Sequence, residues 1–512
     1  MNVELALVSH TNAGKTTLAR TLLGRDVGDV RDAAHVTDLA ERYELLRLDD
    51  GTALWLWDTP GFGDSARLLQ RLRLAANPLG WLLREAWDRW RDRPFWCSQQ
   101  AVRAARESAD VVLYLVNAAE DPRDAGYLAA EIQVLRWVGR PVIVLLNQVG
   151  PPREAAAEQQ DLAHWRRHLD ALGGVAEVLA LDAFARCWVH ETVLLEAIAR
   201  VLPPDKAAAF AGLAQAWVAR STARFEASMA LLAGQLAAAA LDREPVPAPA
   251  ATDGAGGTLR RLLDSVTAPR TAVDPAREAA MNALATRLDA GIVASTDRLI
   301  VLHGLDGSAT RTVLERLGAN FAAAEHFAEG RAALWGSVVT GALTGLKADL
   351  ASGGLTLGGG LLLGGLLGGL AGAGVARGLN RLSGADEPRI WWSDEALEGL
   401  ARSAVLRYLA VAHFGRGRGR WTPGEAPASW QDEVAAVLHG EAAALQACWQ
   451  RARELAAATT AAGSGAEPAG NAAQSEAVGG LERQLQAVLG RATAAVLARL
   501  YPDSVPPGLG LG

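Results

Sequence analysis

A polar segment between an apolar strand and a helix restricts the fold of this chain more than any other feature. The apolar run Val3 to Val8 is followed by Ser-His-Thr-Asn-Ala-Gly-Lys-Thr at residues 9–16, and a helical pattern begins directly afterwards. In such a loop the backbone amides point inward and form, with the helix N-terminus, a concave anion site. Lys15 would reach terminal phosphates, and the Thr16 hydroxyl would bind Mg²⁺. Ser9 stands where Gly is usual, and Ser is costly there if its φ must be positive.

A second motif, Asp-Thr-Pro-Gly at residues 58–61, follows the apolar run Leu54 to Trp57. An acid at the end of such a strand can hold Mg²⁺ through water, and the amide of Gly61 can sense a γ-phosphate. A loop between the two motifs should supply a threonine to the metal. We assign this role to Thr37.

Further apolar runs alternate with helical stretches along the first 200 or so residues. They are Val111 to Val116, Val142 to Leu146 and Val175 to Leu181. Strands that are continuously apolar and alternate with helices predict a doubly wound parallel sheet, covered by helices on both faces. Every motif falls just after a strand, where open α/β sheets bind their ligands.

The order of these motifs resembles that of Era/TrmE-like bacterial GTPases. Residues 146–153 read Leu-Asn-Gln-Val-Gly-Pro-Pro-Arg, which is similar to the subgroup with LNQxGPPR in place of NKxD and a long C-terminal domain of unknown function. The GTPase resemblance covers residues 1–203. It implies binding of GTP and GDP with Mg²⁺, and slow hydrolysis coupled to a change of shape.

The residues expected to form the nucleotide site lie in these motifs. The candidate nucleotide-binding residues are Asn12, Ala13, Gly14, Lys15, Thr16, Thr17, Asp58, Asn147 and Gln148. The candidate Mg²⁺ ligands are Thr16, Thr37 and Asp58. The candidate catalytic residues are Lys15, Thr37 and Gly61.

Selection of guanine should be weaker than in NKxD proteins, whose Asp carboxylate accepts two hydrogen bonds from the base. Gly150 has no side chain at that position, and Gln148 is shorter than Lys and uncharged. A hydrogen bond to a charged acceptor contributes about 1.5–3 kcal/mol, so we expect discrimination to fall by about tenfold or more. Asp182 or a backbone carbonyl is the candidate for partial compensation.

Intrinsic hydrolysis should be slow, because Phe62 stands where Ras-type switches hold the Gln that orients the attacking water. Asn12 occupies the position from which TrmE-like enzymes ligate a K⁺ ion that bridges the phosphates. The alternative is that Asn12 only caps its loop.

His10 and His35 border the phosphate site, and since the resemblance gives neither a catalytic role, we treat both as loop residues.

Composition favours a cytoplasmic protein. The three cysteines of the 512-residue chain are far apart and form no CxxC pair, which argues against a disulfide framework or a zinc site. Because residues 3–8 are expected to form the first strand, we expect no signal peptide there. The net charge of −7 argues against a dedicated nucleic-acid surface.

The pattern becomes helical after the GTPase domain. Residues 204–457 predict an all-α domain, residues 458–478 a low-complexity linker, and residues 479–512 a terminal helix and tail. A Gly-rich hydrophobic block occupies residues 332–376.

This block predicts membrane contact. The 27 residues from Leu350 to Ala376 carry no charge, which is enough for a helix to cross a hydrocarbon layer roughly 30 Å thick. Small residues recur there every four positions, a pattern that lets helices approach closely in lipid. We expect a Gly-rich helical hairpin at the inner face of the cell membrane. The alternative is a Gly-zippered hairpin buried in the helical domain.

Two further segments allow more than one interpretation. In residues 77–96, Trp81, Trp87 and Trp90 fall at helical spacing among charged residues, which fits a membrane interface or the groove of a partner, or simple packing on the neighbouring domain. Residues 413–421 carry three Arg residues that alternate with Gly, which fits binding of lipid phosphates or nucleic acid, or a solvated turn or intramolecular anchor.

The leading prediction is therefore a membrane-associated GTP-hydrolysing switch whose turnover depends on an activator, on assembly or on a cation. One alternative is a dynamin-like membrane protein whose self-assembly is controlled by nucleotide, and a homodimer through the GTPase domain stays open. Another is an Era-like RNA or ribosome-assembly factor, which the acidic net charge disfavours.

Overall fold

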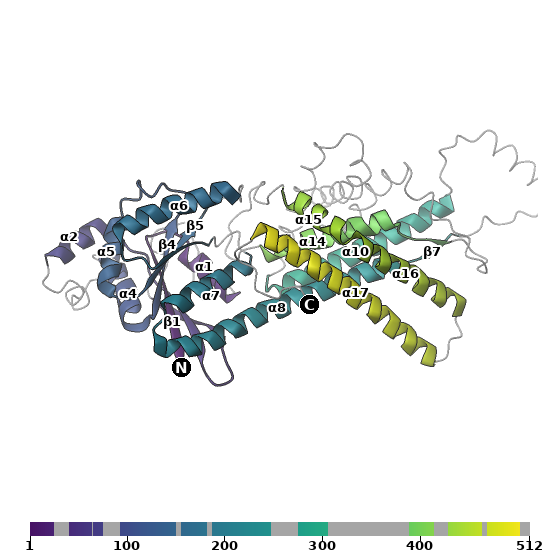
Figure 1. Cartoon of the computed structure of the whole chain (residues 1–512), viewed down its shortest axis with the longest axis horizontal. Coiled ribbons are helices and arrows are strands. Elements are labelled where there is room, and N and C mark those ends of the chain that lie inside the picture. The colour runs from purple at the N-terminus through teal and green to yellow at the C-terminus, as the bar shows by residue number, and fades with distance from the viewer. Residues whose placement is uncertain are drawn as a thin grey trace, which may run out of the picture.

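The computed structural model contains a sheet-based N-terminal domain and a helical C-terminal domain, joined by one long helix (Figure 1). The structure describes residues 1–24, 40–63, 65–74, 93–149, 155–181, 187–246, 275–305, 389–413, 429–462 and 468–501. The predicted fold class is confirmed, since an α/β domain with a mostly parallel sheet precedes a helical region.

The sheet has the strand order β2-β3-β1-β4-β5-β6. Its strands are β1 (Asn2–Ser9), β2 (Glu41–Arg47), β3 (Ala53–Asp58), β4 (Val111–Asn117), β5 (Val142–Asn147) and β6 (Glu177–Ala180). The central strands are buried on both faces, as parallel strands with continuous apolar runs should be. The edge strand β2 runs antiparallel to β3 with a bulge between Glu44 and Leu46. The sequence analysis did not predict β2, because its charged residues break the apolar pattern.

Helices cover both faces of the sheet. On one face lie α2 (Ser65–Arg73), α4 (Arg93–Arg103), α5 (Leu128–Val138) and α6 (Ala155–Leu172). The opposite face carries α1 (Lys15–Leu23), α7 (Val189–Val201) and the first half of α8 (Pro204–Leu241). This arrangement leaves the carboxyl ends of the strands open for a ligand.

The helix α8 belongs to both domains (Figure 1). Phe210, Leu213 and Trp217 pack in the core beneath the sheet. Further along, Phe225 and Leu232 pack in the core of the helical domain. The hydrophobic core of the GTPase domain therefore extends beyond residue 203 into α8.

The helical domain packs four further helices and a short one around the second half of α8. They are α10 (Pro275–Leu302), α14 (Asp394–Ala412), α15 (Ser429–Gly440), α16 (Ala442–Ala462) and α17 (Pro468–Leu500). A two-stranded ladder, β7 (Glu244–Pro245) with β8 (Arg389–Ile390), is the exception to the all-α prediction among the described residues. The stretch 458–478, predicted as a linker, differs too, because α16 continues to Ala462 and α17 begins at Pro468.

Several predicted features lie outside the described residues. These are the Gly-rich block 332–376, the tryptophans at 81, 87 and 90, and residues 414–421. Within the described ranges, none of the helices combines the length and apolar character that a membrane crossing needs.

The end of α14 carries a buried histidine, His413, which is 5% exposed. Its Nδ1 lies 2.7 Å from the carbonyl oxygen of Leu409, and its Nε2 lies 2.6 Å from the hydroxyl of Tyr501. This pairing suits a neutral ring that donates from Nδ1 and accepts at Nε2. Burial lowers the pKa of His413 to about 4, opposed by the bond to Leu409.

We predict that the helical domain loses stability as the pH falls below about 6.5, the ordinary pKa of His. The unfolded chain binds a proton at His413 more readily than the folded chain, so this contribution is complete above pH 6.5 and is lost as the pH drops towards 4. At pH 5 the cost is about 2 kcal/mol. Urea unfolding of His413→Gln at pH 7 and pH 5 should show a correspondingly smaller pH effect. The exposed control His439→Gln should behave as the wild type; equal pH effects in all three proteins would contradict the prediction.

Candidate functional site

The phosphate-binding loop joins β1 to α1, with Gly14 at the helix N-cap. Gly14 has a φ of 90° and Asn12 a φ of 65°, both in the left-handed region. A Cβ on Gly14 would stand 2.6 Å from Asn147 Nδ2. Glycine at this position is therefore required both by the backbone and by the close approach of Asn147.

Ser9 fits the loop without strain. The left-handed residues of the described chain other than glycine are Asn12 and Gln148, so Ser9 needs no positive φ. Ser9 is fully buried, and its hydroxyl accepts a hydrogen bond of 2.8 Å from Lys15 Nζ. The expected cost of Ser in place of Gly does not arise, and Ser9 instead holds the lysine.

The start of α1 meets the end of β3 beside the phosphate-binding loop, where Lys15, Thr16 and Asp58 lie. Thr16 Oγ1 donates a 2.7 Å hydrogen bond to Asp58 Oδ2. Burial lowers the pKa of Lys15, an effect that the charges of Asp58 and Glu131 oppose. Burial also raises the pKa of Asp58 to about 6, although Lys15 and Thr16 act in the other direction. Both charges lack the stabilisation that water would give them.

These residues fit Mg²⁺. Asp58 Oδ1 is buried and finds no hydrogen-bond partner among the described residues, while Oδ2 is bonded to the Thr16 hydroxyl. Carboxylate and hydroxyl oxygens are ligands that Mg²⁺ accepts together with phosphate oxygens. When bound at such a site, Mg²⁺ neutralises charge on the β- and γ-phosphates.

The loop after Asp58 lies against the phosphate-binding loop. The amide of Phe62 donates a 2.8 Å hydrogen bond to the Ser9 carbonyl, and the Phe62 ring is fully buried. A Cβ on Gly61 would stand 2.9 Å from Thr11 Cα, so only glycine permits this approach. The structure thus places Gly61 beside the phosphate-binding loop, and the side chain of the next residue, Phe62, has no polar atom that could orient a water molecule.

The segment expected to bind the base is hydrogen-bonded to the same loop. Asn147 is buried at the end of β5, and its Nδ2 donates a 2.8 Å hydrogen bond to the carbonyl of Ala13. Gln148 follows with a φ of 59°. A Cβ on Gly14 would come within 3.9 Å of Gln148 Nε2, so both side chains border the phosphate-binding loop.

The remaining predicted residues divide into two groups. Thr17 lies in the first turn of α1 and is buried, with its carbonyl accepting a hydrogen bond from the Thr21 hydroxyl. Thr37, Gly150 and Asp182 lie outside the described residues, so their roles stay predictions.

Sequence reasoning missed one group at the site. Glu131 of α5 is fully buried and contacts His10 and Ser65. His10 was expected to be a plain loop residue, but it lies 2.7 Å from the Glu131 carboxylate. A signal existed in the sequence, since Glu131 interrupts the apolar helix Leu128–Val138, but its partners are far away along the chain.

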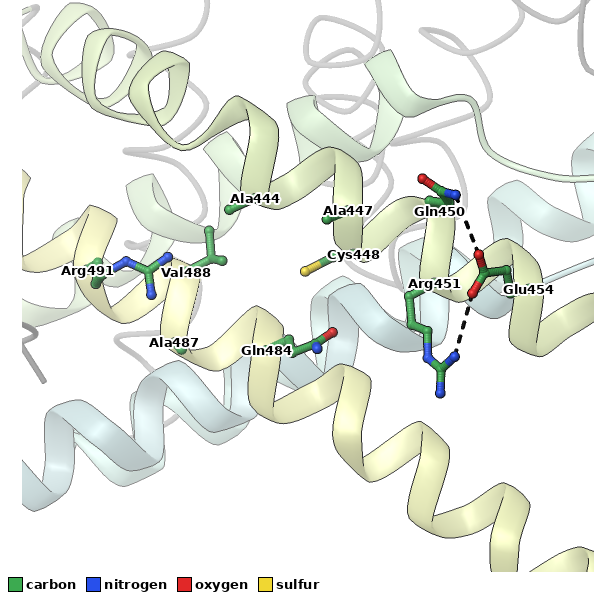
Figure 2. Close-up of a pocket in the computed structure, with 10 residues that line it drawn as sticks. All are labelled: Ala444, Ala447, Cys448, Gln450, Arg451, Glu454, Gln484, Ala487, Val488 and Arg491. Carbon is green, nitrogen blue, oxygen red and sulfur yellow. Dashed lines mark hydrogen bonds and ion pairs between the residues drawn. The ribbon is translucent and has the colours of Figure 1, made fainter.

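A groove of about 490 Å³ lies far from this site, between α16 and α17 (Figure 2). The apolar residues that line it include Ala444, Ala447 and Val488. Its two arginines are already in ion pairs, Arg491 with Glu441 at 2.8 Å and Arg451 with Glu454 at 3.5 Å. Gln450 and Arg451 of its lining both pair with Glu454 (Figure 2), and we place the functional site at the phosphate-binding loop.

The fold and this site define a P-loop GTPase domain. A model described as 50S ribosome-binding GTPase matches residues 4–148. The chain as a whole belongs to the family of the domain of unknown function DUF3482, whose model matches residues 166–481, more than half of the chain. That match begins within α6, so it includes β6 and α7 of the sheet domain as well as the helical domain.

Solved structures of Era are similar to part of this chain. Era in complex with MgGDPNP and part of 16S ribosomal RNA is 19% identical, with a TM-score of 0.30, over 40% of this chain and 57% of that one. An Aquifex aeolicus Era variant bound to GDP and AlF₄⁻ is 19% identical, with a TM-score of 0.28 and the same coverage. The match thus spans little more than half of either Era chain. A search of curated proteins gave no match.

We predict that Gly14→Ala abolishes tight nucleotide binding, because the new Cβ would collide with the Asn147 amide and strain the loop. The matched control is Gly24→Ala at the end of α1, where φ is 65° and nothing lies within 4 Å of the new Cβ. The control should lose about 1–2 kcal/mol of stability from the left-handed backbone alone. Titration with fluorescent GDP should show at least a roughly tenfold loss for Gly14→Ala and none for Gly24→Ala. Equal affinities would contradict the assignment.

Proposed function

We propose that this protein is a GTP-hydrolysing switch whose nucleotide state is transmitted to the helical domain, and that the helical domain engages a membrane. The observation that carries the proposal is α8, which packs in the cores of both domains without a break. The binding of GTP is supported by the P-loop GTPase domain.

The first half of α8 is anchored to the sheet at the end that lies away from the phosphate-binding loop. Lys206 Nζ lies 2.6 and 2.7 Å from the two carboxylate oxygens of Asp110, next to β4. Arg220 donates a 3.3 Å hydrogen bond to the carbonyl of Leu45, at the bulge of β2. Strand β2 follows directly after the segment that contains Thr37. A displacement of β2 would therefore act on α8.

A second contact joins the domains behind the base-binding edge. Trp188, at the N-cap of α7, donates a 2.9 Å hydrogen bond to the hydroxyl of Tyr408 in α14. Phe225 of α8 packs on both rings, with centroid distances of 6.4 Å to Trp188 and 5.6 Å to Tyr408. The segment that contains Asp182 precedes Trp188, so a shift at the base would reach the helical domain here.

Hydrolysis in this proposal is slow and depends on a cation. The buried Phe62 supports slow turnover, because no side-chain donor or acceptor follows Gly61. Asn12 is exposed at the phosphate-binding loop, as a K⁺ ligand must be. The left-handed φ of 65° gives a second reason for Asn there, since Asn adopts this conformation more readily than most residues. Mg²⁺ held by Thr16, Thr37 and Asp58 completes the proposed site.

The membrane contact rests on residues 332–376, and a homodimer through the GTPase domain belongs to the same proposal.

A ribosome-associated role is the second candidate function, because the model that matches residues 4–148 describes ribosome-binding GTPases. Guanine selection remains part of the proposal, with weaker discrimination than in NKxD proteins because Gly150 lacks a side chain.

We predict that the full chain hydrolyses GTP slowly, and faster in K⁺ than in Na⁺ at equal ionic strength. The test variant is Asn12→Gly, which removes the amide but tolerates the left-handed backbone, whereas Ala would add strain. It should lose the difference between the two salts and keep Mg²⁺-dependent binding of GDP. Equal wild-type rates in K⁺ and Na⁺ would exclude the cation site. Turnover that rises with protein concentration would favour the dynamin-like alternative.

We predict that lipid vesicles bind the full chain in a nucleotide-dependent manner. In a flotation assay the bound fraction should differ between GTPγS and GDP, and Tyr408→Phe should reduce that difference because it breaks the bond to Trp188. The control Tyr501→Phe removes a hydroxyl bonded to His413 within the helical domain and should keep the difference. Flotation independent of nucleotide would contradict the coupling. Binding to large ribosomal subunits without flotation would favour the second candidate.

A further inference from the structure

A fully buried carboxylate lies behind the phosphate-binding loop. Glu131, on α5, is 0% exposed and has three hydrogen-bonding partners. Its Oε2 accepts a 2.7 Å hydrogen bond from the Tyr114 hydroxyl. Its Oε1 lies 2.7 Å from His10 Nδ1 and accepts a hydrogen bond from Ser65 Oγ. Burying a carboxylate costs several kcal/mol unless its partners compensate, so this arrangement calls for a physical reason.

Two of the three partners of Glu131 come from segments expected to flank a γ-phosphate, while the third, Tyr114, lies on β4. His10 is the second residue of the phosphate-binding loop, and Ser65 is the first residue of α2. The His10 ring stacks on Tyr127 with a centroid distance of 4.3 Å and an interplanar angle of 14°, so it is held against the start of α5. One carboxylate thus connects two segments that are 55 residues apart along the chain.

The residues between these two anchors include Gly61, the expected γ-phosphate contact. Phe62 is tied to Ser9 by its amide, and Gly63 donates a 3.2 Å hydrogen bond to Ser98 Oγ. The Ser65 hydroxyl also lies 3.2 Å from the Gly63 carbonyl. The loop is therefore held against the phosphate-binding loop at its beginning, and against Glu131 at its end.

We propose that Glu131 is a positioning residue that sets the distance between the Gly61 amide and the phosphate-binding loop, by holding His10 and Ser65 on one carboxylate. It acts on the γ-phosphate only through these two residues. This inference deepens the proposed GTPase function and rests on it. It also explains why a carboxylate is buried where an apolar residue would pack more cheaply.

The test uses the full chain with Glu131→Gln, which keeps the size of the side chain but loses the charge and one acceptor oxygen. GTP turnover should fall roughly tenfold, since a hydrogen bond to a charged group is lost at a γ-phosphate contact. The affinity for GDP should change by less than about twofold, because GDP has no γ-phosphate. The ratio of the affinities for GTPγS and GDP should fall as well, and this ratio does not depend on hydrolysis.

The milder variants Ser65→Ala and His10→Phe keep the inference testable if Glu131→Gln fails to fold. His10→Phe retains a ring to stack on Tyr127. Because both residues act through one carboxylate, the double variant should lose less than the product of the two single losses. If the double variant lowers the ratio of GTPγS to GDP affinity by the full product of the two single losses, the two residues do not act through one carboxylate, and the proposal is overturned.

The matched control is Asp110→Asn, another carboxylate-to-amide change in the same domain, at a residue paired with Lys206 rather than with the phosphate-binding loop. It should lower thermal stability without changing turnover or the affinity ratio. A Glu131→Gln protein with the wild-type ratio would overturn the positioning role and leave the GTPase proposal intact. A wild type without GTP turnover would contradict the proposed function, while the affinity ratio would still decide the role of Glu131.

Discussion

The structure depends on one helix, α8, whose apolar residues belong to two hydrophobic cores. Phe210 and Trp217 pack beneath the sheet, and Phe225 and Leu232 pack in the helical domain. The 38 residues of α8 extend for about 57 Å. A continuous helix with each half packed in a hydrophobic core cannot bend freely, so the two domains share one rigid element. The position of the sheet edge, where β2 meets α8 through Arg220, then bears on the packing of the helical domain.

The chemistry of the nucleotide site follows from charges that are buried before any ligand arrives. Burial lowers the pKa of Lys15 and raises that of Asp58, so both charged forms are under-stabilised in the free protein. A phosphate beside Lys15 and a cation beside Asp58 would replace the electrostatic stabilisation that these charges lose when they are removed from water. The free energy stored in these charges thus favours a ligand that brings both signs together, as a magnesium nucleotide does. Glu131 contributes a further buried charge that supports Lys15.

The sequence was sufficient for features set by local chemistry. Each of three features depends on a short continuous stretch of sequence and was therefore predicted: the phosphate-binding loop, the Asp58 motif and the parallel strands. Features that depend on residues far apart along the chain were not predicted. His10 and Glu131 are 121 positions apart, and the strand β2 is held mainly by its pairing with β3. The effect of Ser9 was also beyond prediction, because its cost depends on a φ that only the folded loop defines. Buried polar pairs across a long sequence separation leave no periodic signal.

The two strained residues of the site are adjacent to one hydrogen bond. Asn12 and Gln148 are the described non-glycine residues with positive φ, and each such residue costs about 1–3 kcal/mol. Asn12 precedes Ala13 and Gln148 follows Asn147, while the Asn147 amide is bonded to the Ala13 carbonyl. Strain of this kind persists only where the surroundings fix the backbone. This hydrogen bond therefore links the backbone conformation of the phosphate-binding loop to that of the segment at Asn147 and Gln148. A ligand that contacts either segment would therefore act on the backbone of both.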